Sequence, residues 1–405
     1  MSHFWGKLTV KGSDRFEETL TQLLQEIRES VSENFPPASY KALLLIGGYG
    51  KGEGGVEIIQ GIEKPHNNFD LLLITQKNDL SLEYLKVRLD NLLKPISQRY
   101  DINLETSVVP FQQLKRSSPP LIWYEMFQAH KVIAGDSNFT SSLPSYRLND
   151  VAEDEFLTLL VNRGTLLIIN LWLIKAGLCN TTAQRKVIIK HTMKAIIGFG
   201  DALLYFLGDY HWSYQEKQKF MRNRQDISPD FKDLYESATT FRFQPDYAAY
   251  LSKDLNAWMH ELLSPLAEIF LQIESIRLEN PLLTWDNYFS LFLKKSWGQN
   301  LFSKRGITEK IKGILTLPKS PCGEGWQEKS AFCLLSPQQK TAFIFPVIAF
   351  SVGPESLASQ VKEYLKADSN NLEEKYLIHW GQSNDPNFFH SMEDWKKTKI
   401  NRSID

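Results

Sequence analysis

The stretch "ALLLIGGYGKGEGGVE" at residues 42–57, followed by "NNFDLLLIT" at residues 67–75, decides how the first part of this 405-residue chain folds. In each stretch an apolar run predicts a buried strand. The first run ends in two consecutive glycines, which is typical of a tight turn. The sequence therefore raises the question of whether this turn holds a nucleotide, and of which kind.

The flanking segments predict a compact α/β unit around these strands. Residues 14–34 space apolar side chains at helical intervals and are followed by two prolines at 36–37. Residues 82–96 have the pattern of a second amphipathic helix, and the middle of 100–114 alternates like a strand. The order is helix, strand, glycine turn, strand, helix, strand, and we expect this unit to end near residue 140.

The rest of the chain has a different character. Residues 150–300 consist of long helical patterns with few strand signals, so we expect a helical domain at 141–305 after the first domain at 1–140. The last part, 306–405, contains the expected loop "LPKSPCGEGW" at 317–326 and the apolar run "TAFIFPVIAFSV" at 341–352, but its pattern predicts no definite structure. The chain is thus expected to be an α+β protein.

Composition limits the classes of partner. The net charge of -1 gives no field that would attract nucleic acid or anionic lipid, so a small molecule or a protein is the expected partner. Cys179, Cys322 and Cys333 lack metal-site or disulfide-framework spacing, which favours the cytoplasm. The apolar run 165–174 stops at Lys175, and we expect it to be too short to span a bilayer.

Two familiar kinds of glycine turn fit poorly. A Walker A loop ends in Gly-Lys-Ser/Thr, whereas Gly52 follows Lys51 here and Leu45 stands at the position of the first glycine. The dinucleotide pattern G-x-G-x-x-G is present at Gly50, Gly52 and Gly55. It should open a helix and be followed by an acid after the next strand, but Asp70 precedes that strand.

A third interpretation combines the glycines with acidic residues. Because side chains alternate along a strand, Asn68 and Asp70 share one face while Phe69 and Leu71 point toward the core. A third strand would place Asp101, Asn103, Glu105 and Ser107 on a common face, with Glu105 the best-placed second carboxylate. Magnesium uses one or two carboxylates together with phosphate oxygens, so this arrangement predicts metal-assisted chemistry on a nucleotide.

These motifs resemble those of the DNA polymerase β-like nucleotidyltransferases. Residues 47–52, Gly-Gly-Tyr-Gly-Lys-Gly, are similar to the Gly-Ser-x-x-Arg-Gly turn of that family. Asn68-Phe69-Asp70 is similar to its Asp-x-Asp pair, and Glu105 falls where its third acid is found. The resemblance implies a nucleotidyltransferase-type mixed-sheet core, a following helical domain, and transfer of a nucleoside monophosphate from a triphosphate such as ATP to a hydroxyl of a small molecule or protein.

The resemblance also implies roles for individual residues. A Mg²⁺ or Mn²⁺ ion would be bound by the catalytic residues Asp70, Glu105 and Asn68. The helical domain of such proteins supplies basic residues to the triphosphate. The nucleotide-binding candidates are Gly47, Gly48, Lys51 and Gly52 in the turn, and Lys190 and Lys194 one helical turn apart in the helical domain.

Departures from the family pattern leave two hypotheses open. Gly48 replaces serine, Lys51 replaces arginine, and Asn68 replaces an aspartate, so the chain is either an enzyme with a degenerate first acid or an inactive relative that senses nucleotides or binds proteins. Glu53 could supply the missing acid. Asp201 either orients an acceptor or pairs with a lysine. The aromatic residues Trp123, Tyr124, Trp212 and Tyr214 are expected in the core.

Overall fold

The computed structural model describes residues 4–76, 81–115, 119–301 and 331–385, together with 388, 392, 393 and 395. Cys322 and the loop expected at 317–326 lie outside the described residues. The chain divides into two compact units. The first comprises Met1–Glu155, His211–Arg222 and Glu236–Asp246, and the second comprises Phe156–Tyr210, Asn223–Tyr235 and Tyr247–Asp405. The expected end of the first domain at residue 140 and the expected end of the helical domain at residue 305 stay predictions.

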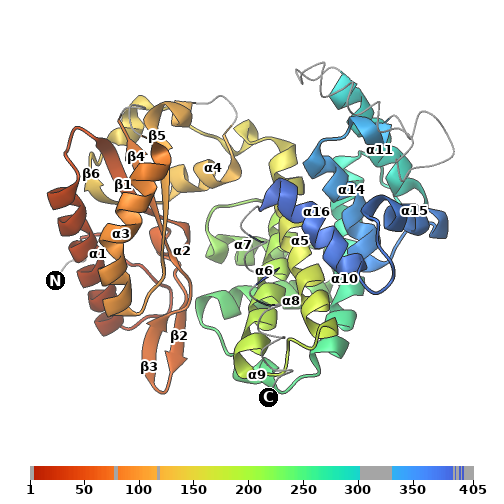
Figure 1. Ribbon diagram of the computed structural model, residues 1–405, viewed down its shortest axis with the longest axis horizontal. Helices are drawn as coiled ribbons and strands as arrows, with labels where there is room; N and C mark the ends of the chain where they lie inside the picture. The colour runs from red at the N-terminus through yellow and green to blue at the C-terminus, as the bar shows by residue number, and fades with distance from the viewer. Residues whose placement is uncertain are drawn as a thin grey trace. The chain divides into compact units, whose positions relative to one another are not determined.

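The first unit is built on a mixed four-stranded sheet in the order β5-β4-β1-β6, which confirms the α+β class (Figure 1). The neighbours β1 and β4 are antiparallel, whereas β4 and β5 are parallel. The antiparallel pair excludes the dinucleotide-binding alternative, in which consecutive strands run parallel through a crossover helix. The strands are β1 (Tyr40–Ile46), β4 (Phe69–Thr75), β5 (Leu104–Pro110) and β6 (Lys131–Gly135).

The glycine turn and a hairpin connect β1 to β4. The turn contains the short helix α2 (Gly47–Gly50), and the hairpin consists of β2 (Val56–Ile59) and β3 (Ile62–Pro65). Gln60 and Gly61 at its tip both have positive φ angles, which suits a tight two-residue hairpin loop.

Helices cover both faces of this sheet. On one face, α1 (Asp14–Asn34) and α3 (Leu82–Tyr100) lie side by side and pack on Leu43, Phe69 and Leu73 (Figure 1). On the other face, α4 (Leu121–Gln128) packs on Leu44 and Leu72. This division follows from the alternation of side chains along the strands.

The boundaries of these helices agree closely with the sequence patterns, with one exception. The helix α1 has the predicted limits, and Ser13 caps it by accepting a hydrogen bond from the Phe16 amide. The helix α3 continues past its predicted end at residue 96, and Asp101 closes it with a left-handed backbone. Asp101 therefore does not lie on the strand face expected for it, because β5 begins only at Leu104.

The second unit contains no strand among its described residues. The helical character expected for residues 150–300 is confirmed, and the apolar run at 341–352 forms most of a buried helix, α14. Helices α7 and α8 each contribute residues to both units. The described helices from residue 153 onward are α5 (Glu153–Lys175), α6 (Thr182–Phe206), α7 (Tyr214–Asn223), α8 (Pro229–Phe243), α9 (Ala248–Leu251), α10 (Leu255–Arg277), α11 (Trp285–Leu301), α14 (Pro337–Phe350), α15 (Glu355–Leu365) and α16 (Leu372–Asn384).

The helix α5 corrects the expectation that its apolar run is too short to span a bilayer. It extends back to Glu153, and by length and hydropathy it passes the test for a membrane span, as the bent pair of α14 and α15 does together. However, 61% of its most apolar 18-residue window is buried inside the protein. Core helices of soluble proteins have the same properties.

Candidate functional site

Two of the predicted acids lie next to each other on the sheet. Asp70 of β4 and Glu105 of β5 are register partners in the parallel pair. Neighbouring strands are about 4.8 Å apart and partner side chains point to the same side, so the two carboxylates are neighbours on one face. Phe69 and Leu71 are buried on the opposite face, as predicted. The shared-face prediction for Asp70 and Glu105 is thus confirmed.

The acid pair lines a cavity of about 280 Å³ in the first unit. The cavity also includes two residues of the glycine turn and three residues of α4, so it brings together four of the predicted site residues: Gly47, Lys51, Asp70 and Glu105. The complete lining is Ile46, Gly47, Lys51, Asp70, Leu71, Glu105, Ser107, Ile122, Glu125 and Met126.

Gly47 provides the space that the carboxylate of Asp70 occupies. Its φ angle is +65°, and a Cβ atom at this position would lie 2.1 Å from Asp70 Oδ2. Both facts require glycine at this position. A Cβ at Gly48 would lie 3.1 Å from Nη2 of Arg242, so the second glycine of the turn allows this guanidinium to approach.

Two later glycines of the turn, Gly52 and Gly54, have structural reasons of their own. Gly52 has a φ angle of +78°, and a Cβ there would lie 2.9 Å from the carbonyl oxygen of Lys7. Its amide donates a hydrogen bond to the Tyr49 carbonyl, and Gly52 does not line the cavity. A Cβ at Gly54 would collide with the Tyr49 ring. The nucleotide-binding role expected for Gly52 stays a prediction.

Asn68 has a direct contact with the acid pair. Its Nδ2 donates a hydrogen bond to Oε1 of Glu105. An aspartate could not donate this bond when ionised, because a carboxylate only accepts. Asn68 therefore orients Glu105. The expected role of Asn68 as a metal ligand stays a prediction.

The carboxylate of Glu125 on α4 bridges two buried lysines. Its Oε2 lies 2.8 Å from Nζ of Lys51, and its Oε1 lies 3.8 Å from Nζ of Lys217. The side chain of Lys51 is 4% exposed and that of Lys217 is fully buried, whereas Glu125 is 21% exposed. Charges this poorly hydrated need close partners, and Glu125 serves both.

Tyr214 lies among three cations. The centroid of its ring is 5.2 Å from Nζ of Lys51, 4.5 Å from Nζ of Lys217 and 4.1 Å from Cζ of Arg242. Such contacts are favourable because the face of an aromatic ring is negative. Tyr214 was expected in the core but is only half-buried, as is Trp212. The core prediction is confirmed for Trp123 and Tyr124.

Glu53 of the glycine turn caps α7. Its buried carboxylate accepts hydrogen bonds from Ser213 Oγ at 2.6 Å, from the Tyr214 amide at 2.9 Å and from the Gln215 amide at 3.2 Å. Glu53 does not line the cavity with Asp70 and Glu105. The idea that Glu53 supplies the missing acid is therefore wrong, because its oxygens serve the start of a helix.

Sequence reasoning missed Glu125, Lys217 and Arg242. Lys217 and Arg242 come from helices α7 and α8, more than a hundred residues after the glycine turn. Glu125 lies in an apolar helix without a motif. These residues are identified only by the ion pairs of the Glu125 carboxylate and by the cations around the Tyr214 ring. The sequence contains no signal for these contacts.

The expected triphosphate lysines belong to the second unit. Lys190 and Lys194 lie on α6 and are half-buried. Between them, His191 donates from Nδ1 toward Oδ1 of Asn170 at 3.1 Å, and burial, aided by the two lysines, lowers its pKa to about 3. Their binding of a nucleotide stays a prediction. Asp201 accepts a hydrogen bond from the Tyr235 hydroxyl at 2.8 Å, a partner that the sequence did not predict.

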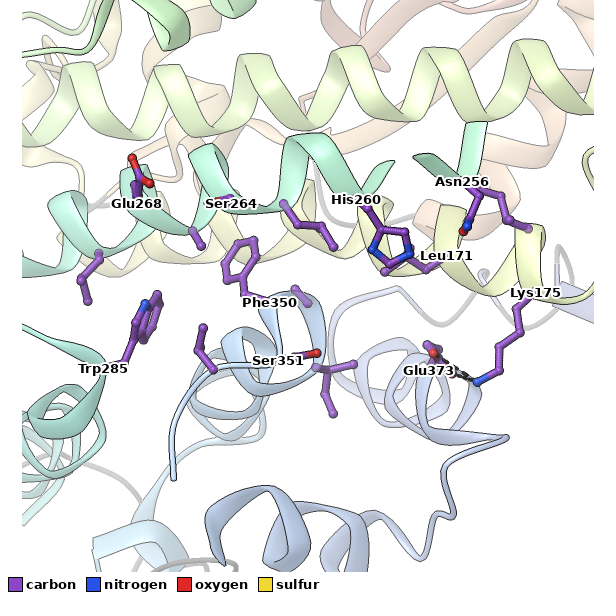
Figure 2. Close-up of a pocket in the computed structure, with 17 residues that line it drawn as sticks. Leu171, Lys175, Asn256, His260, Ser264, Glu268, Trp285, Phe350, Ser351 and Glu373 are labelled. Carbon is purple, nitrogen blue, oxygen red and sulfur yellow. Dashed lines mark hydrogen bonds and ion pairs between the residues drawn. The ribbon is translucent and has the colours of Figure 1, made fainter. Parts of the chain in front are cut away.

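A larger cavity of about 830 Å³ lies within the second unit, but it contains none of the predicted site residues. Figure 2 shows Trp285 and Phe350 in one part of this cavity and the Lys175–Glu373 ion pair, 3.1 Å long, in another. His260 of α10 also lines this cavity (Figure 2). This cavity is larger than the acid-lined one. The two carboxylates of its described lining, Glu268 and Glu373, lie at opposite ends of it (Figure 2), so they are not placed to hold one metal with a phosphate.

The acid pair fits a magnesium ion of the kind that phosphate substrates bring with them. The described part of the chain contains no group of three or more His, Cys, Asp or Glu side chains that could hold a metal. Magnesium in nucleotide sites commonly has only one or two carboxylate ligands and takes the others from phosphate and water. Asp70 and Glu105, adjacent on one face and lining one cavity, meet that requirement.

Comparison of the chain with protein-family models, curated proteins and solved structures finds no match.

Proposed function

We propose that this protein is a metal-dependent nucleotidyltransferase whose active site is the cavity at Asp70 and Glu105. One observation carries the proposal: the two acids are register partners that face the same cavity as Gly47 and Lys51. The reaction transfers a nucleoside monophosphate from a triphosphate to a hydroxyl of a small molecule or protein, and pyrophosphate leaves.

Each group of the cavity has a role in this proposal. Asp70 and Glu105 would hold Mg²⁺ or Mn²⁺, with the carbonyl oxygen of Asn68 as a third ligand. When bound, the ion neutralises the triphosphate and stabilises the charge that develops during transfer. Lys51 binds a phosphate oxygen through its ammonium group, and Gly47 keeps the space beside Asp70 open.

The charges of the cavity imply that nucleotide binding depends on the metal. Its described lining contains three carboxylates, Asp70, Glu105 and Glu125, but one ammonium group, that of Lys51. A triphosphate without a divalent cation would therefore bind more weakly than its magnesium complex. We further propose that the protein acts in the cytoplasm on a soluble acceptor, without a membrane or nucleic-acid partner.

A second candidate function is a nucleotide-sensing or protein-binding module that has lost catalysis. The hydrogen bond from Asn68 to Glu105 favours it, because it uses one oxygen of a proposed metal ligand. The two candidates share a nucleotide-binding cavity, so binding tests the cavity and turnover separates the candidates.

Thermal unfolding with each nucleoside triphosphate, with and without Mg²⁺, tests the binding proposal. At 100 times its dissociation constant a ligand should stabilise the protein by about 2.7 kcal/mol. We expect this effect to be much larger with Mg²⁺ than without it, and we expect Asp70→Asn to remove the difference.

The matched control for that experiment is Asp101→Asn, which removes the same charge from an exposed residue nearby. Its left-handed backbone suits asparagine, so the fold should tolerate the change. Equal stabilisation of the parent and Asp70→Asn, or none with any nucleotide, would contradict the proposal.

A further inference from the structure

We infer that Lys51 and Lys217 form an oxyanion-binding site whose occupant in this structure is the carboxylate of Glu125, and that a phosphate group of the substrate displaces this carboxylate. The inference rests on the proposed function, because it names the second part of the same site. It assigns roles to Lys217 and Glu125, which no sequence motif marks.

Geometry supports an exchangeable anion at this position. The two oxygens of Glu125 are divided between the two ammonium groups, at 2.8 Å from Lys51 and 3.8 Å from Lys217. A phosphate group also presents several oxygens to cations at such distances. Lys51 and Glu125 both line the cavity of Asp70 and Glu105, so an anion there can reach the same ammonium group.

Burial distinguishes the cations from the carboxylate. The side chain of Lys51 is 4% exposed and that of Lys217 is fully buried, so both are fixed by their surroundings. Glu125 is 21% exposed and therefore retains access to water when it leaves them. The carboxylate, rather than the lysines, is the member that moves at low cost.

The neighbourhood is adapted to hold the cations in place. Both lysines and Arg242 lie over the ring of Tyr214. The backbone of Tyr214 is itself fixed by the hydrogen bond from its amide to Glu53. Nε of Arg242 is buried and has no hydrogen-bond partner among the described residues, and Nη2 of the same guanidinium approaches Gly48. This third cation extends the positive region to the glycine turn.

The test measures anion binding with metal removed by EDTA, so that it does not depend on Asp70, Glu105 or turnover. Inorganic triphosphate is the probe for a nucleotide, and inorganic phosphate is the probe for a phosphorylated acceptor. Calorimetry compares the parent with Glu125→Gln, which keeps the shape of the side chain but removes the competing charge. The control is Glu83→Gln, an exposed acid of α3.

We expect Glu125→Gln to bind one of these anions about tenfold more tightly, as the loss of a partly buried competing ion pair should allow. Tighter binding of triphosphate assigns the site to the nucleotide, and tighter binding of phosphate alone assigns it to the acceptor. Unchanged or weaker affinity for both, in a variant that unfolds cooperatively, overturns the inference.

A second variant provides a result if Glu125→Gln does not fold. Lys51→Gln in the otherwise unchanged protein should weaken triphosphate or phosphate binding about tenfold, because it removes one of the two ammonium groups. Equal affinity of Lys51→Gln and the parent overturns the inference. Because neither experiment measures nucleotide transfer, a failure of the proposed reaction remains distinguishable from a failure of the oxyanion site.

Discussion

Gly47 is the residue where the end of β1 meets the acid of β4. Its positive φ angle and the 2.1 Å that would separate a Cβ atom from Asp70 Oδ2 are independent reasons for glycine. Gly61, at the tip of the β2–β3 hairpin, has a similar φ angle of +79° but open space around the position of a Cβ atom. Comparing substitutions at Gly47 and Gly61 therefore separates the cost of backbone strain from the cost of a collision with the Asp70 carboxylate.

We predict that Gly61→Ala lowers the free energy of unfolding by about 1 kcal/mol through backbone strain alone. Gly47→Ala should cost clearly more, because the new methyl group must also displace the carboxylate of Asp70. It should also weaken Mg²⁺-dependent nucleotide binding, which Gly61→Ala should leave unchanged. Urea unfolding and nucleotide titration measure the two effects, and equal losses for both variants would show that Asp70 does not need this space.

Asn68 gives a second prediction at this scale. In Asn68→Asp a second carboxylate would face Glu105 in place of the amide that donates to it. Without metal the variant should be less stable than the parent, by about 1–3 kcal/mol, because a hydrogen bond becomes a repulsion. Added Mg²⁺ should restore that loss, since the ion is attracted by the extra charge.

The control for this prediction is Asn103→Asp, which adds the same charge at an exposed position two residues before Glu105. Thermal unfolding in EDTA and in Mg²⁺ makes the comparison. If Asn68→Asp is destabilised and Mg²⁺ restores nothing, Asp70 and Glu105 do not hold a metal.

The sequence was sufficient to predict which side of the sheet Asp70 and Glu105 face, because a strand has a period of two and each acid adjoins a buried run. It was not sufficient to predict the partners of Lys51. Glu125, Lys217 and Tyr214 reach it from α4 and α7, and their positions depend on packing between distant segments.

At the scale of elements, the start of α7 depends on the glycine turn. Glu53 is 2% exposed and accepts three hydrogen bonds at this helix terminus, where a negative charge is also favoured by the helix dipole. One residue of the turn thus positions Tyr214, and through its ring the cations around it.

We predict that Glu53→Gln lowers the free energy of unfolding by about 1–3 kcal/mol, because buried donors at the start of α7 lose their charged acceptor. Glu216→Gln, on the same helix but partly exposed with a lysine three residues later, should cost less than about 1 kcal/mol. Chemical unfolding of the two variants measures this difference. Equal costs would mean that the cap contributes little to stability.

The limits of elements were predictable where a local signal marks them. Ser13 and the prolines after residue 35 mark both ends of α1, whose predicted and observed limits agree. The predicted end of α3 at residue 96 is four residues too early, because the helix accommodates Pro95 and ends at Tyr100.

At the scale of the whole molecule, two half-buried histidines make stability depend on pH. Burial lowers the pKa of His191 to about 3 and that of His379 to about 4. In the unfolded chain a histidine has its usual pKa near 6.5. As pH falls below 6.5, the unfolded state takes up protons that the folded state does not, so stability is fully present above pH 6.5 and decreases toward pH 4.

We predict that His191 accounts for a loss of about 2 kcal/mol between pH 6.5 and pH 5. Between pH 6.5 and pH 5 the free energy of unfolding of His191→Gln should therefore fall by about 2 kcal/mol less than that of the parent. This difference does not depend on how stable the variant is at neutral pH. His260→Gln, at an exposed position of α10, is the control and should keep the dependence of the parent. Identical pH profiles for the parent and His191→Gln would show that His191 is protonated in the folded protein.

The most direct test of the central claim is pyrophosphate release in Mg²⁺ with a panel of nucleoside triphosphates and hydroxyl acceptors. We expect acceptor-dependent release by the parent and by Asp101→Asn, and a loss of about a hundredfold or more in Asp70→Asn. Release by Asp70→Asn at the rate of the parent would contradict the assignment of the active site. Nucleotide binding without release, for every triphosphate and acceptor, would contradict the transferase itself and leave the nucleotide-sensing module.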